Sequence, residues 1–165
     1  MDGIVVSPTQ YLAAEDEETS EVNKRRPALT HHPMIPVSVK PVAVGVDLVD
    51  VREVRRDLQR FGDRYLRRLF TQDEIAYCQR ASDSAPHLAA RIAAKEAVIK
   101  VLRVEDLQPP WTTIEVLREP AGWCTIRLSG EAARQAAERK IGECTLSLSH
   151  EGDFAIAFVV AAPAP

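Results

Sequence analysis

The chain has 165 residues, of which 45% are hydrophobic and 27% charged, and its net charge is −3; these values are typical of a single folded domain. No apolar run approaches the ~20 residues of a membrane-spanning helix, and the amino terminus lacks the apolar stretch of a signal peptide. The three cysteines are widely spaced without a CxxC motif, which argues against a disulfide framework or a zinc site. We therefore expect a cytoplasmic protein with no membrane partner.

The amino-terminal segment, residues 1–40, has the composition of a flexible extension. An acidic run at 15–18 and a basic run at 24–26 are interrupted and followed by prolines. Such a sequence buries too little apolar surface to offset the entropy lost on ordering. We expect the folded domain to span residues 41–162.

The folded part is expected to begin with a short buried strand at 42–46, because these residues form a continuous apolar run. The run stops at Asp47, which is either a turn residue or a metal ligand at a strand end. Asp50 and Glu53 have the spacing of a capping box and predict a helix over residues 51–61.

This helix and the segment after it are rich in arginine. Seven arginines and three acidic residues lie between positions 52 and 68, although the whole chain is negatively charged. The excess indicates either an acidic partner or a solvated basic face; we do not expect nucleic acid, because the chain as a whole is acidic. The candidate partner-binding residues are Arg52, Arg55, Arg56, Arg60, Arg64 and Arg68.

After a shorter helix that begins with Thr71 as its cap, the central element is a helix over residues 87–102. It is apolar almost all round and yet contains Arg91, Lys95, Glu96 and Lys100. Arg91 and Lys95 are four residues apart and repel each other unless an anion such as phosphate binds them. A carboxylate beside them favours a metal ion bound to the same anion. The alternative is that Glu96 and Lys100 form an ordinary surface ion pair.

The remaining elements predict an α+β fold, an antiparallel sheet packed with helices. Residues 112–118 and 123–128 read as a hairpin, and residues 131–141 as an Ala-rich helix. A half-buried strand at 144–149 leads to His150, a turn and an apolar strand at 154–161. A histidine at such a turn is either structural or functional.

Four motifs occur together in a fixed order: GVDLVD at 45–50, FTQDE at 70–74, LAARIAAKEA at 88–97 followed by Lys100, and SLSHE at 147–151. On these motifs the chain resembles the holo-acyl-carrier-protein synthases, the small trimeric type of 4′-phosphopantetheinyl transferase. The resemblance covers about residues 42–161 and implies an α+β, 4′-phosphopantetheinyl transferase-like fold.

The resemblance implies Mg²⁺-dependent transfer of phosphopantetheine from coenzyme A to a serine of an acyl carrier protein, with 3′,5′-ADP released. Asp47 and Glu96 would bind Mg²⁺ and, with Lys100, form the catalytic set. Lys100, with Lys95 beside it, would neutralise the pyrophosphate of coenzyme A. Arg91 and His150 resemble residues that hold the 3′-phosphate. The proton of the attacking serine would pass to a metal-bound water or to one of the two carboxylates.

The resemblance also implies partners. The arginine-rich helix would bind the acidic carrier protein, from fatty-acid or polyketide synthesis, and the chain would form a homotrimer with active sites between subunits. The family usually has a Gly-rich segment shortly after Lys100, whereas this chain has residues 102–107 followed by Pro109 and Pro110. A carrier-protein binding module without activity is the alternative function, and it would not need Asp47, Glu96 and Lys100 together.

Overall fold

The computed structural model describes residues 42–104 and 107–165. The predicted flexible extension over residues 1–40 lies outside the described residues. The elements in chain order are β1 (Ala43–Asp50), α3 (Val51–Phe61), α4 (Asp63–Leu69), α5 (Gln72–Cys78), α6 (Ala85–Leu102), a 3₁₀ turn η3 (Trp111–Thr113), β2 (Ile114–Arg118), β3 (Cys124–Leu128), α7 (Gly130–Glu138), β4 (Ile141–Glu151) and β5 (Phe154–Pro163). None of the described helices is long and apolar enough to cross a membrane.

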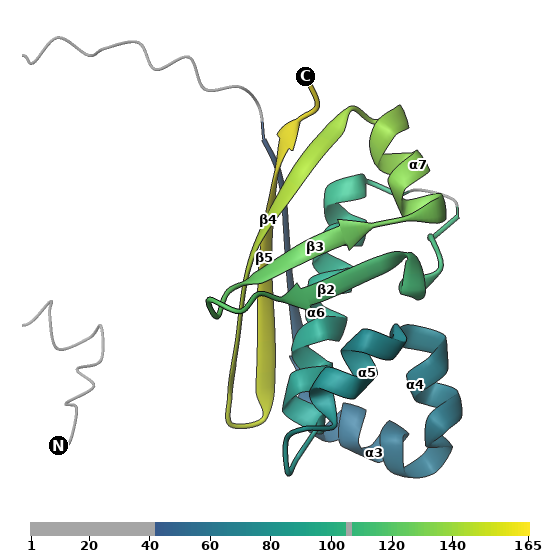
Figure 1. Ribbon diagram of the computed structural model, residues 1–165, viewed down its shortest axis with the longest axis vertical. Helices are drawn as coiled ribbons and strands as arrows, with labels where there is room; N and C mark the ends of the chain where they lie inside the picture. The colour runs from purple at the N-terminus through teal and green to yellow at the C-terminus, as the bar shows by residue number, and fades with distance from the viewer. Residues whose placement is uncertain (1–41, 105–106) are drawn as a thin grey trace, which may run out of the picture. The chain divides into compact units, whose positions relative to one another are not determined.

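The described strands form one antiparallel sheet in the order β1-β5-β4-β3-β2. Figure 1 shows α3, α4 and α5 grouped at one end of the domain and α7 at the other. The predicted α+β class is therefore confirmed. The order also leaves β1 at one edge of the sheet, where its outer backbone groups pair with no other described strand.

Helix α6 packs along the inner face of the sheet and forms the centre of the core. Ala93, Ala94 and Ala97 are fully buried, and these small side chains let the helix approach the strands closely. The helix begins two residues before the predicted start, because Pro86 fits its first turn. Arg103 ends it in the left-handed conformation.

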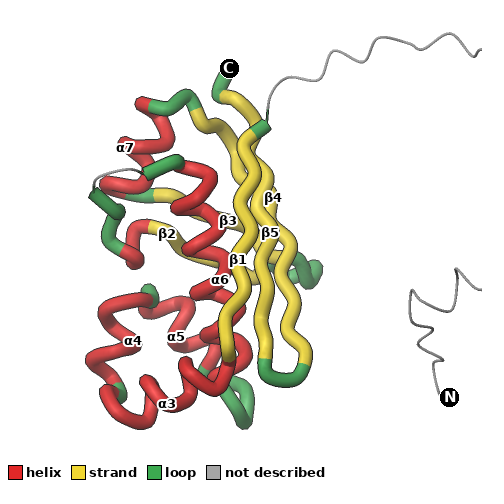
Figure 2. Tube along the Cα trace, turned by 180° about the vertical axis from the view of Figure 1, so that it is seen from behind, coloured by secondary structure: helices red, strands yellow, loops and turns green. Residues whose placement is uncertain are grey.

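Strand β1 differs from the prediction in two ways. It continues to Asp50, so Asp47 lies in the middle of the strand and pairs with Ala157, rather than ending the strand. Its apolar run is also not buried on both faces: Val44, Val46 and Leu48 are 50%, 47% and 60% exposed. Figure 2 shows why, since the helices cover only one side of β1, β5 and β4.

The helical end of the domain confirms both predicted caps. Asp50 caps α3, and its side chain accepts a hydrogen bond from the backbone N–H of Arg52, but the Glu53 carboxylate does not accept the predicted reciprocal bond from the backbone N–H of Asp50. The hydrogen bonds from Arg52 hold the pKa of Asp50 at about 2. Thr71 and Glu74 form a full capping box at α5. Helix α4, which the sequence did not predict, follows a break at Gly62, where φ is +51°.

The carboxy-terminal half follows the predicted order with shifted boundaries. The hairpin of β2 and β3 is confirmed, with Ile114 opposite Leu128. Helix α7 ends at Glu138 rather than at Ile141, because Ile141 already pairs with Pro163 as the first residue of β4.

Candidate functional site

A charged cluster lies where the free edge of the sheet meets α6. The ammonium of Lys100 donates to the Asp47 carboxylate at 2.8 Å and to the Val46 carbonyl at 2.7 Å. The side chain of Asp47 is 20% exposed and that of Lys100 51% exposed. The pair is therefore preformed but reachable from solvent.

Glu96 belongs to the same cluster, one helical turn before Lys100. Burial raises the pKa of Glu96, the negative charge of Asp47 raises it further, and the positive charge of Lys100 opposes both. Two carboxylates thus share one site with a single neighbouring ammonium. This is the arrangement in which a divalent cation is stabilised.

The two carboxylates fit a Mg²⁺ ion rather than a metal held by protein alone. The part of the chain that is described contains no group of three or more His, Cys, Asp and Glu residues able to hold a metal. Mg²⁺ commonly takes one or two carboxylates and completes its shell with waters and phosphate oxygens of a substrate. Asp47 and Glu96 are the residues that would bind it here.

A second cluster surrounds a cavity of about 300 Å³ on the other side of α6. Arg91 is only 3% exposed, its Nε has no hydrogen-bond partner, and no ion pair links it to a described carboxylate. Its guanidinium lies 4.4 Å from the centre of the Tyr77 ring and donates to the His87 carbonyl. His150 lines the same cavity. A buried cation without a carboxylate partner favours an anionic ligand.

Lys95 is not part of either cluster, which corrects its predicted role in binding the coenzyme. Its side chain is fully buried, and its ammonium donates to the Glu74 carboxylate and to the carbonyls of Leu69 and Trp111. All three of its protons are therefore used inside the core. The predicted cationic pair of Arg91 and Lys95 does not form, because the two side chains have separate environments.

The two clusters lie on different sides of α6. Nine residues separate Arg91 from Lys100, which corresponds to about 13 Å of rise and about half a turn between their directions. A larger cavity of about 710 Å³ between the carboxy ends of α6 and α7 is lined by none of the predicted site residues. The chemistry of the chain is therefore divided between two separate groups of side chains.

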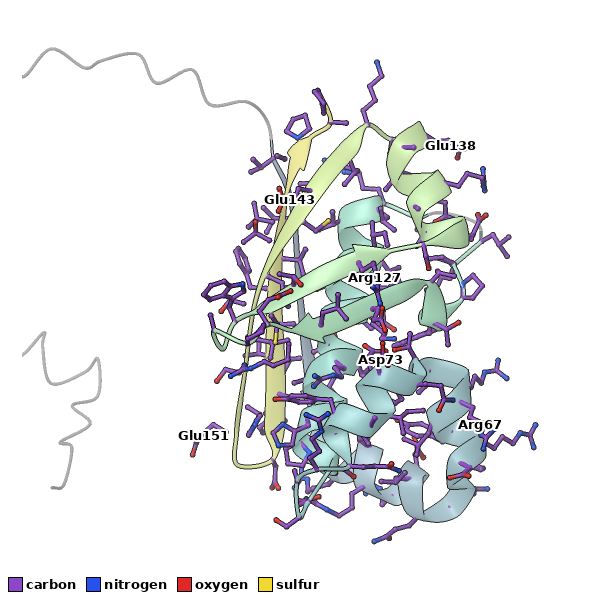
Figure 3. The ribbon with its side chains drawn as sticks, in the orientation of Figure 1. Arg67, Asp73, Arg127, Glu138, Glu143 and Glu151 are labelled. Carbon is purple, nitrogen blue, oxygen red and sulfur yellow. The ribbon has the colours of Figure 1, made fainter. Side chains whose placement is uncertain are left out.

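The arginine-rich surface covers α3 and α4. Arg52 pairs with Asp50 and Asp153, Arg55 with Asp83, and Arg56 with Glu53. Figure 3 shows Arg67, on the same surface, projecting away from α4. The arginines of the predicted set that form no ion pair with a described residue are Arg60, Arg64 and Arg68.

Sequence reasoning did not predict three residues around the second cavity, namely Tyr77, His87 and Arg118. A signal was present for His87, because it precedes Arg91 by four residues and such residues share a helix face. Arg118 is distant in sequence, on β2, and its position depends on how the sheet packs against α6.

Comparison with known proteins supports one family. Residues 43–159 match the family model of the 4′-phosphopantetheinyl transferase superfamily. The chain is 44% identical over 120 residues to a holo-[acyl-carrier-protein] synthase of Desulforudis audaxviator, covering 73% of this chain and 92% of that protein. It is 41% identical over 117 residues to a protein of the same name from Dehalococcoides mccartyi, covering 71% and 95%.

Solved structures give the same result. A Chronobacterium ammoniagenes complex of ACPS with coenzyme A is 34% identical and has a TM-score of 0.67, covering 76% of this chain and 100% of that one. The holo-[acyl-carrier-protein] synthase of Helicobacter pylori in complex with coenzyme A is 28% identical with a TM-score of 0.64, covering 72% and 99%. Each of these solved chains is covered almost completely.

Proposed function

This chain belongs to the 4′-phosphopantetheinyl transferase superfamily, and on that premise we propose that it is a holo-acyl-carrier-protein synthase. It transfers the 4′-phosphopantetheine group of coenzyme A to a serine hydroxyl of an acyl carrier protein. The serine oxygen forms a bond to the phosphorus that bears pantetheine, the bond from that phosphorus to the bridging oxygen breaks, and 3′,5′-ADP leaves. The cluster of Asp47, Glu96 and Lys100 is the observation that supports this reaction most directly.

Asp47 and Glu96 are proposed to bind Mg²⁺ at the edge of β1. The bound ion would supply charge stabilisation for the pyrophosphate and for the departing 3′,5′-ADP. The shared position of the two carboxylates supports this assignment, because the charge of Asp47 raises the pKa of Glu96 and a bound cation would offset that repulsion. The strand and helix that hold them also fix their spacing before any ligand arrives.

Lys100 is proposed to neutralise the pyrophosphate. Its ammonium already lies at the carboxylate pair and has three protons to donate, of which the Asp47 carboxylate and the Val46 carbonyl receive two. A phosphate oxygen can accept the third. Negative charge increases on the leaving group during transfer, and a fixed ammonium at that position favours it.

The proton of the attacking serine is proposed to pass to a water at the metal site or to one of the two carboxylates, Asp47 or Glu96. No nucleophile from this chain is needed, because the nucleophile belongs to the carrier protein.

Arg91 and His150 are proposed to bind the 3′-phosphate of coenzyme A. This phosphate and the pyrophosphate are attached to the same ribose, whereas Arg91 and Lys100 lie on different sides of α6. One coenzyme molecule is therefore proposed to use the metal cluster of one subunit and the phosphate cavity of another, so that the complete site forms between subunits.

The uncovered face of the sheet supports the proposed homotrimer. Val46 lies opposite Phe158, and Leu48 lies opposite Ile156, and all four side chains are more than 40% exposed. A contiguous apolar surface of this kind usually marks a protein interface. The stoichiometry of three is taken from the family resemblance, and the apolar face provides the surface that such an assembly requires.

The arginines of α3 and α4 are proposed to bind the acidic carrier protein. Arg60, Arg64 and Arg68 are the members of the set best available for a partner, since no described carboxylate pairs with them.

We also propose a cytoplasmic site of action. Cys78, Cys124 and Cys144 are all free thiols, which fits a reducing compartment.

The proposed reaction is tested by incubating the protein with apo acyl carrier protein, coenzyme A and Mg²⁺. Holo carrier protein and 3′,5′-ADP should accumulate in equal amounts. Release of nucleotide without modification of the carrier protein would indicate a hydrolase, and absence of both products with several carrier proteins would support a binding module without activity.

A further inference from the structure

The cavity of about 300 Å³ around Arg91 and His150, here called the phosphate cavity, contains a second imidazole. It belongs to His87, to which the proposed reaction assigns no role. The ring of His87 lies 5.3 Å from that of His150 and 6.2 Å from that of Tyr77, measured between centroids, and meets both nearly edge to face. His87 lies on α6, one turn before Arg91. The backbone carbonyl of His87 accepts a hydrogen bond from the Arg91 guanidinium. The two histidines therefore border one space from two different elements.

Arg118 contributes a further positive charge to the same space, from the end of β2. Its guanidinium contacts the Cys124 sulfur at 3.9 Å, and it forms no ion pair with a carboxylate among residues 42–104 and 107–165. Together with Arg91, it places two arginines and two imidazoles around about 300 Å³. The two arginines are cationic and the two imidazoles can become so, which gives the cavity more positive charge than a singly charged anion requires.

We propose that His87 and Arg118 complete the binding site for the 3′-phosphate of coenzyme A, and that His87 binds it in the protonated form. This inference rests on the proposed function for the identity of the nucleotide. It assigns two phosphate-binding residues beyond Arg91 and His150, and it makes the selection of coenzyme A over 3′-dephospho-coenzyme A dependent on pH.

The charges around His87 determine the direction of the pH dependence. The charged and titratable groups around His87 come from every element packed against it. They are Arg91 of α6, His150 of β4, Arg118 of β2, Cys124 of β3, Tyr77 of α5 and Asp83 of the loop before α6. Burial lowers the pKa of His87 in the free protein, and the charges of His150, Arg91 and Arg118 lower it further, whereas Asp83 opposes them. His87 is therefore neutral at neutral pH until an anion arrives.

A phosphate dianion reverses that balance, because a nearby negative charge favours the protonated imidazole. Binding of the phosphate thus takes up a proton, and affinity is higher at a pH where that proton is available. The advantage is lost as pH rises through the pKa of His87 in the complex. Below about pH 6 the phosphate monoester itself becomes protonated, so the selectivity should be greatest between about pH 6 and pH 7.

The test uses two nucleotides that differ only in the 3′-phosphate, namely 3′,5′-ADP and 5′-AMP. Their affinities for the full chain are measured by calorimetry from pH 6 to pH 8, in buffers of different ionisation enthalpy so that proton uptake is counted. We expect 3′,5′-ADP to bind with proton uptake and more tightly at pH 6 than at pH 8. The ratio of the two affinities should rise as the pH falls from 8 to 6, because both nucleotides contain the same 5′-phosphate and differ only in the 3′-phosphate.

Two substitutions separate the proposal from a structural role. His87→Phe keeps an aromatic ring against His150 and Tyr77 but removes the proton, and Arg118→Gln removes the charge. Each should weaken 3′,5′-ADP about tenfold to a hundredfold, as expected for loss of a hydrogen bond to a charged group, and leave 5′-AMP unchanged. Arg134→Gln is the matched control, since that arginine lies on α7 and pairs with Glu131 and Glu138.

The proposal is supported only if the ratio of the two affinities falls in both variants and proton uptake falls in His87→Phe. An unchanged ratio, or an equal loss for both nucleotides, would overturn it, and unfolding temperatures identify a variant that fails to fold. If His87→Phe fails to fold, His87→Gln provides a second neutral replacement. If 3′,5′-ADP binds as expected but no phosphopantetheine is transferred, the transferase function fails while the phosphate site stands.

Discussion

Gly45 and Ala97 bring β1 and α6 into backbone contact. A Cβ atom built on Gly45 would lie 2.0 Å from the Ala97 carbonyl oxygen, a distance that real atoms do not reach. The glycine therefore fixes how closely the strand approaches the helix. Asp47 lies two residues beyond Gly45, and Glu96 is the neighbour of Ala97, so this contact also fixes the spacing of the two carboxylates.

Gly45→Ala should destabilise the protein, because the new methyl group meets backbone rather than a side chain that can move. Overpacking of a core typically costs about 1–3 kcal/mol of unfolding free energy, and we expect the upper end of that range here. Urea unfolding gives the value. Ala137→Leu is the control, because Ala137 is exposed on α7 and leucine is a good helix former. Equal stability of the two variants would contradict the close contact.

Lys95→Met should destabilise the fold without weakening coenzyme binding directly. The Glu74 carboxylate would lose its buried ammonium partner, and removing one member of a buried ion pair typically costs about 3–5 kcal/mol. Unfolding in urea measures the loss. The double variant Lys95→Met with Glu74→Gln should recover part of it, because no unpaired charge then remains. If Lys95→Met were stable and bound 3′,5′-ADP weakly, the role first predicted for this lysine would be restored.

Charge reversal on the arginine surface should weaken the carrier protein alone. In the double variant Arg64→Glu with Arg68→Glu we expect KM for the acyl carrier protein to rise about tenfold, because two attractions become repulsions. The KM for coenzyme A should stay unchanged, and the salt dependence of the rate should decrease. Arg134→Glu on α7 is the control. If the arginine double variant and Arg134→Glu raised the KM for the acyl carrier protein equally, the carrier protein would bind at another surface.

Charges on the uncovered sheet face should dissociate the assembly. Val46 and Phe158 are cross-strand neighbours, so Val46→Asp with Phe158→Asp places two carboxylates in the middle of the apolar surface. Sedimentation equilibrium should show a trimer for the unchanged chain and a monomer for the variant. Leu107→Asp is the control, because Leu107 is 72% exposed and lies outside the strands. A trimer that survives the double substitution would assign the interface to another surface.

The pattern of the sequence predicted the fold class and most elements, and it failed where tertiary contacts decide. The run at 42–46 was predicted to be a buried strand, but hydropathy cannot distinguish a strand covered on both faces from one whose apolar outer face awaits another subunit. Helix α4 was not predicted, because only the positive φ of Gly62 separates it from α3.

The same limit applies to the two clusters. Helical spacing placed Lys95 beside Arg91, whereas the carboxylate that binds Lys95 comes from Glu74, 21 residues earlier. Asp47, Glu96 and Lys100 were predicted as one group from the family motifs, and the ion pair of Asp47 with Lys100 places these two side chains together. The position of Arg118 beside Arg91 could not be predicted, because it depends on how β2 packs against α6.

The measurement that tests the central claim most directly is the intact mass of an apo acyl carrier protein after incubation with this protein, coenzyme A and Mg²⁺. We predict a gain of one phosphopantetheine group, its loss in EDTA and its return with excess Mg²⁺. Asp47→Asn and Glu96→Gln should transfer on the order of a hundredfold more slowly with unchanged unfolding temperatures. Transfer that continues in EDTA, or full activity in either variant, would contradict the assignment of these two carboxylates to the metal.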